Sequence, residues 1–285
     1  MINCMNIRVD LHCHGPNEWR YNPTKWNPRK LAELVAGKLE AVGIAEMTET
    51  DHRFENLKIA GKNDKGVYID NNQIHVPEYN ISFFRTEEIS TRLNGISQGH
   101  LLIFGNKNKI IKGSLDEVLD IANEQGAVVI ADHAFTGPHD ANMGLCYANS
   151  PDRVLRYFNE GKIHAMEYNG SLASWAIFNK LTGSIKKNNK AVDFAKKHNL
   201  YLTASTDAHC ISEMTGNRAH TSFEVPSSLG RESELDYVAF FQKTLKTPGN
   251  KIVPVMNPGP AFYLDKHVGE IALFRLMLKL GYEHQ

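Results

Sequence analysis

The chain has 285 residues, of which 42% are hydrophobic and 22% are charged. These proportions are typical of a folded globular protein and exclude a disordered or collagen-like chain. The 32 basic and 32 acidic residues give zero formal net charge, which argues against a nucleic-acid binder that relies on bulk positive charge, without excluding a local patch. The chain also has 13 histidines, as many as it has Phe residues, so the placement of the histidines is the first question.

The sequence indicates a cytoplasmic protein. No apolar run approaches the ~18 residues that span a bilayer, and the first ten residues lack the basic patch and apolar stretch of a secretory signal. The four cysteines are Cys4, Cys13, Cys146 and Cys210. They show no CxxC spacing and are too sparse for a disulfide framework, so we expect a reducing compartment.

Short apolar runs bounded by Gly or Asn predict seven strands. In chain order they are Ile7–His14, Ile44–Thr50, Phe83–Ser90, His100–Phe104, Val128–His133, Ala165–Tyr168 and Tyr201–Ser205. Residues 67–76 contain two short apolar runs around a polar turn, which is typical of a hairpin insertion. The polar, Gly- and Asn-rich stretch 137–151 predicts a loop.

Helical spacing predicts helices between these strands. Pro28 suits the first turn of a helix that carries Leu31 and Leu39 and that Gly43 would end. Ser114 is placed to cap a helix over 115–124, with Glu117 completing a capping box. Another helix is expected around residues 192–195, and the tail 268–280 predicts a further helix that packs on the body.

Alternation of strands and helices favours a mainly parallel α/β sheet, and about seven such units suit a barrel with its site at the carboxyl ends of the strands. No repeat or linker divides the chain. We therefore expect a single domain over residues 1–285, with a core at about 7–225 and a C-terminal extension at about 226–285.

Histidines and acids follow the predicted strands. His12 and His14 alternate along a strand, so both rings project to one side and can hold one metal ion, while Cys13 projects to the other. Asp207 and His209 repeat this spacing after the run 201–204.

Three further pairs occur between these ends of the chain. Asp51 and His52 are adjacent, so we expect one to be a ligand and the other to orient it. Glu88, which is followed by His100, carries a carboxylate that could bridge two metals. A charged pair after a buried strand is costly without a partner, and a metal would supply one for Asp132 and His133.

The order of these motifs resembles that of the PHP (polymerase and histidinol phosphatase) family of metal-dependent phosphoesterases. The matching segments are Asp10–His14 for DLHxH, Thr50–His52 for TDH, Glu88–Ser90 with His100–Leu102 for the central motif, Ala131–Phe135 for AHPF, and Thr206–His209 for SDAH. The resemblance implies a distorted (β/α)7 barrel, here with the hairpin insertion and the extra C-terminal helix.

The resemblance also implies two or three divalent ions, which could be Zn²⁺, Mn²⁺ or Fe²⁺. One ion would be held by His12, His14, Glu88 and Asp207, and a second by Glu88, His100 and His133, with Glu88 as the bridge. His52 and His209 would contribute to a third. Members with a full third site usually place an Asp or His after the first motif, whereas this chain has only Glu18 nearby, and Asp132 stands where the family often has Ala.

The implied activity is hydrolysis of a small phosphorylated metabolite or nucleotide by metal-activated water, with Glu88, Asp207 and His209 as the catalytic residues. Paired divalent ions can clamp a phosphoryl group and lower the pKa of a bridging water. Arg218 resembles a family residue that would meet the substrate phosphate, and Arg53 and Arg20 rank below it. His139 and His220 are further candidates for a general acid or a substrate contact.

Two other functions remain open. Metal-activated water in a barrel also hydrolyses amides and lactones, although no lysine bridge motif is evident. A non-catalytic metal-binding module of nucleic-acid metabolism is the second, and zero net charge weakens it. The sequence predicts no membrane partner and leaves the oligomeric state open.

Overall fold

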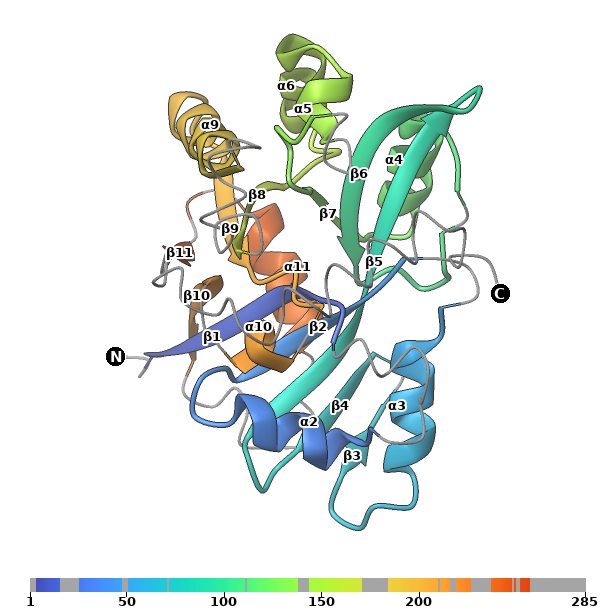
Figure 1. Ribbon diagram of the computed structural model, residues 1–285, viewed down its shortest axis with the longest axis vertical. Helices are drawn as coiled ribbons and strands as arrows, with labels where there is room; N and C mark the ends of the chain where they lie inside the picture. The colour runs from blue at the N-terminus through green and yellow to red at the C-terminus, as the bar shows by residue number, and fades with distance from the viewer. Residues whose placement is uncertain are drawn as a thin grey trace.

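A computed structural model describes the protein over residues 4–15, 26–47, 51–70, 72–110, 112–137, 144–170, 184–209, 211–215, 219–226, 237–247, 249 and 252–256 (Figure 1). Several expectations fall outside these ranges, namely Glu18, Arg20, His139, Cys210, Arg218 and the helix over 268–280.

The described strands form one mixed sheet that curves into a nearly closed barrel. They are β1 (Cys4–Cys13), β2 (Ala41–Glu46), β3 (Tyr68–Ile69), β4 (Gln73–Val76), β5 (Ile81–Leu93), β6 (Ile96–Phe104), β7 (Val128–Ala131), β8 (Ala165–Asn169), β9 (Tyr201–Ser205), β10 (Ala219–Pro226) and β11 (Ile252–Met256). The order is β11-β10-β1-β2-β5-β6-β7-β8-β9. A parallel bridge from Cys13 to Ala208 brings the segment after β9 back to the end of β1.

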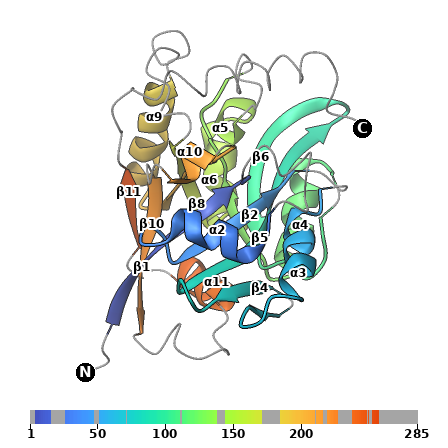
Figure 2. The ribbon, with the colours of Figure 1, turned by 60° about the horizontal axis from the view of Figure 1, so that its bottom comes forward.

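Eight described helices cover this sheet. They are α2 (Pro28–Val35), α3 (Arg53–Gly61), α4 (Leu115–Glu124), α5 (Leu145–Ala148), α6 (Pro151–Asn159), α9 (Ser184–Lys197), α10 (Ile211–Thr215) and α11 (Tyr237–Lys246). None of the described helices is long and apolar enough to cross a membrane. Figure 2 shows β10 and β11 side by side along the β1 edge of the sheet.

The sheet is less parallel than the sequence pattern indicated. β1, β2 and β5 run parallel, as do β7, β8 and β9, but β6 is antiparallel to both of its neighbours. β5 and β6 form a long hairpin, visible at the upper right of Figure 1, because Asn94 and Gly95 both take the positive φ that a tight turn needs. Glu88 and His100 therefore lie within strands and not at carboxyl ends.

Local capping explains the start of one helix, and one glycine corrects another expectation. Ser114 and Glu117 form the predicted capping box of α4. The helix α2 ends at Val35, and Gly43, which was expected to end it, lies inside β2. A Cβ there would lie 2.5 Å from the Leu11 carbonyl oxygen, so glycine allows neighbouring strands to approach. The strand expected over residues 44–50 consequently begins earlier, at Ala41.

The polar insertion and the buried cysteine agree with the sequence analysis. Residues 68–76 form the predicted hairpin, with β3 antiparallel to β4 and β4 added to the edge of β5. Cys13 packs in an apolar cluster with Leu31 and Ile44, on the side of β1 opposite the histidines. Because Cys13 packs in this cluster, the side chains of His12 and His14 point to the other side of β1, toward the interior of the barrel.

Candidate metal centre

Backbone hydrogen bonds join the first and last histidine motifs. The amide of Asp207 donates to the carbonyl of His12 at 2.8 Å, and the amide of His14 donates to the carbonyl of Ala208 at 2.9 Å. The carboxylate of Asp10 strengthens the junction by accepting from the amide and the hydroxyl of Thr206. Motifs almost 200 positions apart in the sequence are therefore held side by side at the ends of β1 and β9.

The first group of candidate ligands combines His12, His14, Glu88 and Asp207. The Nε2 atoms of His12 and His14 are 3.0 Å apart. The Nε2 atom of His14 lies 3.1 Å from Glu88 Oε2 and 3.3 Å from Asp207 Oδ1. The Nε2 atom of His12 lies 3.4 Å from the same Asp207 oxygen. All four side chains are buried or nearly so.

The second ring nitrogens indicate which atoms carry protons. His14 Nδ1 lies 3.1 Å from the carbonyl oxygen of Ala45, and a carbonyl can only accept, so the proton is on Nδ1. His12 Nδ1 lies 3.0 Å from Glu167 Oε1, a carboxylate oxygen that likewise favours a proton on Nδ1. In these tautomers both Nε2 atoms of the neutral rings present lone pairs to each other and to two carboxylates, which is unfavourable unless a proton or a metal ion lies among them.

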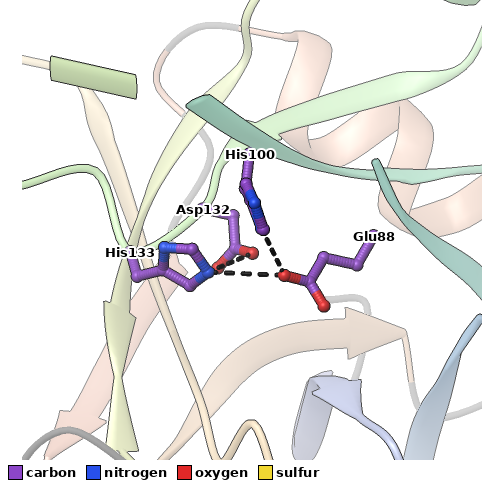
Figure 3. Close-up of side chains that lie close together, drawn as sticks. All are labelled: Glu88, His100, Asp132 and His133. Atoms are coloured by element: carbon purple, nitrogen blue, oxygen red, sulfur yellow. Dashed lines mark hydrogen bonds and ion pairs between the residues drawn. The ribbon is translucent and has the colours of Figure 1, made fainter. Parts of the chain in front are cut away.

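The second group contains Glu88, His100, Asp132 and His133 (Figure 3). Glu88 Oε1 lies 2.7 Å from His100 Nδ1 and 3.4 Å from His133 Nε2. The other oxygen of Glu88 faces the first group, so its carboxylate spans the two groups as expected of a bridging ligand. Asp132 Oδ2 approaches His133 Nε2 at 3.0 Å.

His209 belongs to a third group, and His52 does not. His209 Nε2 lies 3.2 Å from Asp207 Oδ1, and its ring stacks on that of His14 with centroids 4.4 Å apart. His52 is exposed at the N-terminus of α3 and is absent from the candidate groups found among the described residues. Asp51, its neighbour, instead pairs with Arg53.

A fourth group includes Glu167, which sequence reasoning missed. Its carboxylate contacts His12 Nδ1 and accepts from the hydroxyl of Ser205 and from the amide of His133 at 3.2 Å. The available signal was a glutamate within the short strand β8, all of whose residues are buried. Asp132 completes this group, with Oδ1 3.4 Å from His12 Nδ1.

Backbone strain marks two of the candidate ligands. His133 has φ +23° and Asp207 has φ +48°, whereas the other described non-glycine residues with positive φ are all Asn. Asn, Asp and His adopt positive φ more often than other non-glycine residues, but the conformation still has a cost that surrounding structure must offset. Asn169 helps at Asp207 by donating to Oδ2 at 2.9 Å, which leaves Oδ1 facing the histidines.

Burial and opposite charges shift the pKa values of this centre in opposing directions. Burial alone would raise the pKa of Glu88, but hydrogen bonds from His100, His12 and His133 hold it well below its ordinary value. Burial would lower the pKa of His12, yet Asp132, Asp207 and Glu167 outweigh it and raise that pKa well above 6.5. In the absence of metal, protons on histidines therefore balance the acids, and protons and metal ions compete for the same sites.

The donor set fits divalent metal ions. Nitrogen and oxygen ligands lie about 2.1 Å from such an ion, so ligand atoms around one centre are roughly 3.0–3.4 Å apart. The separations within the first two groups mostly fall near that range, from 2.7 Å to 3.4 Å, with 3.8 Å between His12 Nε2 and Glu88 Oε2. Imidazole and carboxylate ligands without thiolates suit Zn²⁺, Mn²⁺ or Fe²⁺.

Two lower-ranked candidates for the substrate contacts lie in structural positions. The guanidinium of Arg53 is buried, pairs with Asp51 and donates to the carbonyl of His14, so it is not free to meet a phosphate. His220 is buried on β10 and lies outside the candidate metal groups found among the described residues. Burial lowers the pKa of His220.

Comparison with solved structures identifies the fold. Chains with a similar fold include PsfC from Pseudomonas syringae, with a TM-score of 0.59 and 13% identity over 96% of this chain and 99% of that chain. The lesion-specific endonuclease PfuEndoQ from Pyrococcus furiosus has a TM-score of 0.52 and 17% identity over 87% of this chain and 58% of that chain. Endonuclease Q in complex with a 27-mer duplex substrate, with an abasic lesion at the active site, has a TM-score of 0.50 and 17% identity over 86% of this chain and 57% of that chain.

These likenesses are structural. No family model and no curated protein matches the sequence. The chain spans little more than half the length of the endonuclease. At these identities the matches establish the fold alone, and together with the nearly closed sheet they confirm the α/β barrel that the motif order implied, although the regular sevenfold repeat is not confirmed.

Proposed function

We propose that this protein is a PHP-family, metal-dependent phosphoesterase that acts in the cytoplasm on a small phosphorylated metabolite or nucleotide. The observation that carries the proposal is the convergence of the Nε2 atoms of His12 and His14 with Oε2 of Glu88 and Oδ1 of Asp207, each oxygen lying 3.1–3.8 Å from both nitrogens. Among the described residues, the ion pairs of these two carboxylates are all with histidines, so their charge is balanced either by protons on those rings or by a cation from outside the chain.

Each side chain would have a defined task. His12, His14 and Asp207 would hold one ion, His100 and His133 a second, and Glu88 would bridge them. When bound, such ions supply Lewis acidity and lower the pKa of water. His209 has a 23% exposed side chain, more than the other histidines of the centre, which supports a role at the substrate side, and its contact with Asp207 would hold its ring. It is the candidate to hold or move a proton at the ester oxygen.

The remaining charge of a phosphate requires a protein cation. Arg218 stays our proposal for this role on the basis of its sequence position after the last motif. Lys112 is a second candidate, because this exposed residue lines a hollow of about 300 Å³ that Glu88 also lines. A cation in such a position would lower KM for phosphate esters without altering metal content.

A nucleic-acid phosphodiester is the second candidate substrate. The structural similarity to a lesion-specific endonuclease over most of this chain favours it. Zero net charge argues for the small substrate.

One assay separates these functions. Protein stripped with a chelator and reloaded with Mn²⁺, Zn²⁺ or Fe²⁺ is tested on p-nitrophenyl phosphate, nucleotide monoesters, duplex DNA with and without an abasic site, and amide and lactone panels. We expect metal-dependent hydrolysis of small phosphate esters. Full activity without metal, or no ester hydrolysis with any of the three ions, contradicts the proposal, and cleavage of amides or lactones alone supports the alternative hydrolase.

A further inference from the structure

Asp132 is a buried carboxylate without a hydrogen-bond donor. It follows β7 directly and is fully buried. Neither of its oxygens has a hydrogen-bond partner among the described residues. Its Oδ2 lies 3.0 Å from His133 Nε2 and its Oδ1 lies 3.4 Å from His12 Nδ1, and Glu167 belongs to the same group of side chains. A buried charge left in this state costs several kcal/mol unless a proton or a cation compensates it.

The neighbouring histidines already use their ring protons elsewhere. His133 Nδ1 lies 3.2 Å from the hydroxyl oxygen of Thr136, and that hydroxyl donates its own proton to the carbonyl of His133. The hydroxyl therefore accepts from Nδ1, so the neutral ring presents a lone pair at Nε2 to Asp132. His12 Nδ1 is closer to Glu167, at 3.0 Å, than to Asp132.

Asp132 thus has the same arrangement as the other carboxylates of the centre, with an oxygen close to the Nε2 atom of a histidine. Its Oδ2 converges with His133 Nε2, and that nitrogen in turn lies 3.4 Å from Glu88 Oε1 (Figure 3). These separations are those of atoms that share one ion. Glu167 differs, because its oxygens accept from Ser205 and from the amide of His133, so the chain supplies it with hydrogen-bond donors.

We propose that Asp132 is a fourth protein ligand of the ion that Glu88, His100 and His133 would hold, and that it makes this site favour Mn²⁺ or Fe²⁺ over Zn²⁺. The inference rests on the proposed metal centre. A second carboxylate adds negative charge, which tightens the binding of any dication, and adds a hard oxygen donor of the kind that suits Mn²⁺ more than Zn²⁺.

Metal titration tests this assignment without reference to catalysis. Chelator-treated wild type, Asp132→Ala, Asp132→Asn and the control Glu87→Gln are titrated with Mn²⁺ and, separately, with Zn²⁺, by competition with a chromogenic chelator. Glu87 is also buried, but it accepts from Asn106 and from the amide of Ile110 outside the metal groups. We expect Asp132→Ala to weaken Mn²⁺ binding at one site by at least about tenfold and Zn²⁺ binding by less, with Glu87→Gln unchanged.

The two results that would overturn the inference are distinct. A Mn²⁺ Kd for Asp132→Ala within threefold of that of wild type would remove Asp132 from the ligands, and an equal loss for Zn²⁺ would remove the preference. Asp132→Asn keeps the shape of the side chain, so its thermal shift on loading with Mn²⁺ reports on binding even if Asp132→Ala folds poorly. A wild-type protein that binds metal but cleaves no phosphate ester would contradict the proposed function and leave this assignment intact.

Discussion

Glu87 and Glu88 are neighbours on β5, but their negative charges are balanced by different kinds of partner. Glu87 points to one face of the strand, where the chain supplies its partners, namely Asn106, Arg85 and the amide of Ile110. Glu46 nearby pairs with Lys109 at 3.1 Å, and Asp51 with Arg53. We call Glu46, Asp51 and Glu87 the balanced cluster. Glu88 points to the other face. Among the described residues, all of its ion pairs are with histidines.

The difference teaches where the chain depends on a ligand. In the balanced cluster each acid has a lysine or arginine, or several amide donors, so it stabilises the fold unaided. In the metal centre, ring tautomers fixed by Ala45, Glu167 and Thr136 turn lone pairs toward the carboxylates. Such an arrangement is held by the fold at a cost that a bound cation would remove. The stability of the metal centre should therefore depend on bound metal, whereas the stability of the balanced cluster should not.

The largest effect is expected when Glu88 is replaced by glutamine, with the same replacement of its neighbour Glu87 as the control. Glu88→Gln removes the charge that faces both groups of histidines, so metal content should fall and phosphatase activity should drop by roughly 10³-fold or more, about 4 kcal/mol of transition-state stabilisation. Elemental analysis and p-nitrophenyl phosphate assays measure both. The control Glu87→Gln should keep the metal and most of the activity. If the metal content of Glu88→Gln equals that of wild type, Glu88 is not the bridging ligand.

Removal of metal should destabilise the protein as a whole. An ion present at about 100 times its Kd adds about 2.7 kcal/mol to the free energy of unfolding. For a domain of this size that corresponds to roughly 5–10 °C in Tm. Thermal unfolding with chelator and with Mn²⁺ measures the shift, which Glu88→Gln should lose and Glu87→Gln should retain. An identical Tm with and without metal in wild type would contradict the comparison between the clusters.

Breaking the balanced cluster should affect stability without affecting metal. Lys109 donates to Glu46 and to the carbonyl of Asp51, so Lys109→Met leaves a buried carboxylate without its cation. We expect a loss of about 2 kcal/mol in the free energy of unfolding, which urea denaturation measures. Metal stoichiometry should equal that of wild type, and a parallel loss of metal would show that the two clusters are not independent.

A half-buried histidine outside both clusters gives the smallest expected effect. Burial and the nearby Lys246 lower the pKa of His164 to about 4. Its Nδ1 accepts from the amide of Val129 at 3.1 Å, which requires the neutral ring. Since the folded pKa lies below the ordinary 6.5, the neutral ring contributes stability above that pH, and the contribution is lost as pH falls toward 4.

The expected loss is about 1 kcal/mol at pH 5.5. His164→Asn retains an acceptor near the position of Nδ1 and cannot titrate, so the difference in stability between wild type and this variant should depend on pH below about 6.5. Urea denaturation at several pH values, with chelator throughout, measures it. A difference that stays constant between pH 7 and 5 would contradict the assignment.

The order of the motifs predicted more of the candidate ligands than the periodicity of apolar residues did. The pairs at positions 12 and 14, and 207 and 209, alternate along extended chain, so their grouping followed from the sequence and the resemblance. Glu167 was missed because it lies within a strand and not at its end. The direction of β6 depends on the turn at Asn94 and Gly95, which apolar runs alone do not reveal.

Other sequence signals had two physical meanings. Gly43 suits a helix end as well as the close approach of strands, and only the neighbouring Leu11 carbonyl decides between them. His52 adjoins a strand end like the other candidates, but the start of α3 places it at the surface. Strands β10 and β11 and helices α3, α5, α6, α10 and α11 did not emerge from the pattern, because tertiary pairing and packing outweigh their weak periodicity. The short helix α5 stands within the stretch 137–151, for which a loop was expected.

Elemental analysis of the purified protein after dialysis against Mn²⁺, Zn²⁺ or Fe²⁺ tests the central claim most directly, because the claim concerns charge that the chain does not itself balance. We predict about two divalent ions per chain, or three if the group around His14, Asp207 and His209 also binds one, and their loss at low pH as protons displace them. A protein that retains none of these ions, with the same Tm in chelator as in metal, would contradict the account.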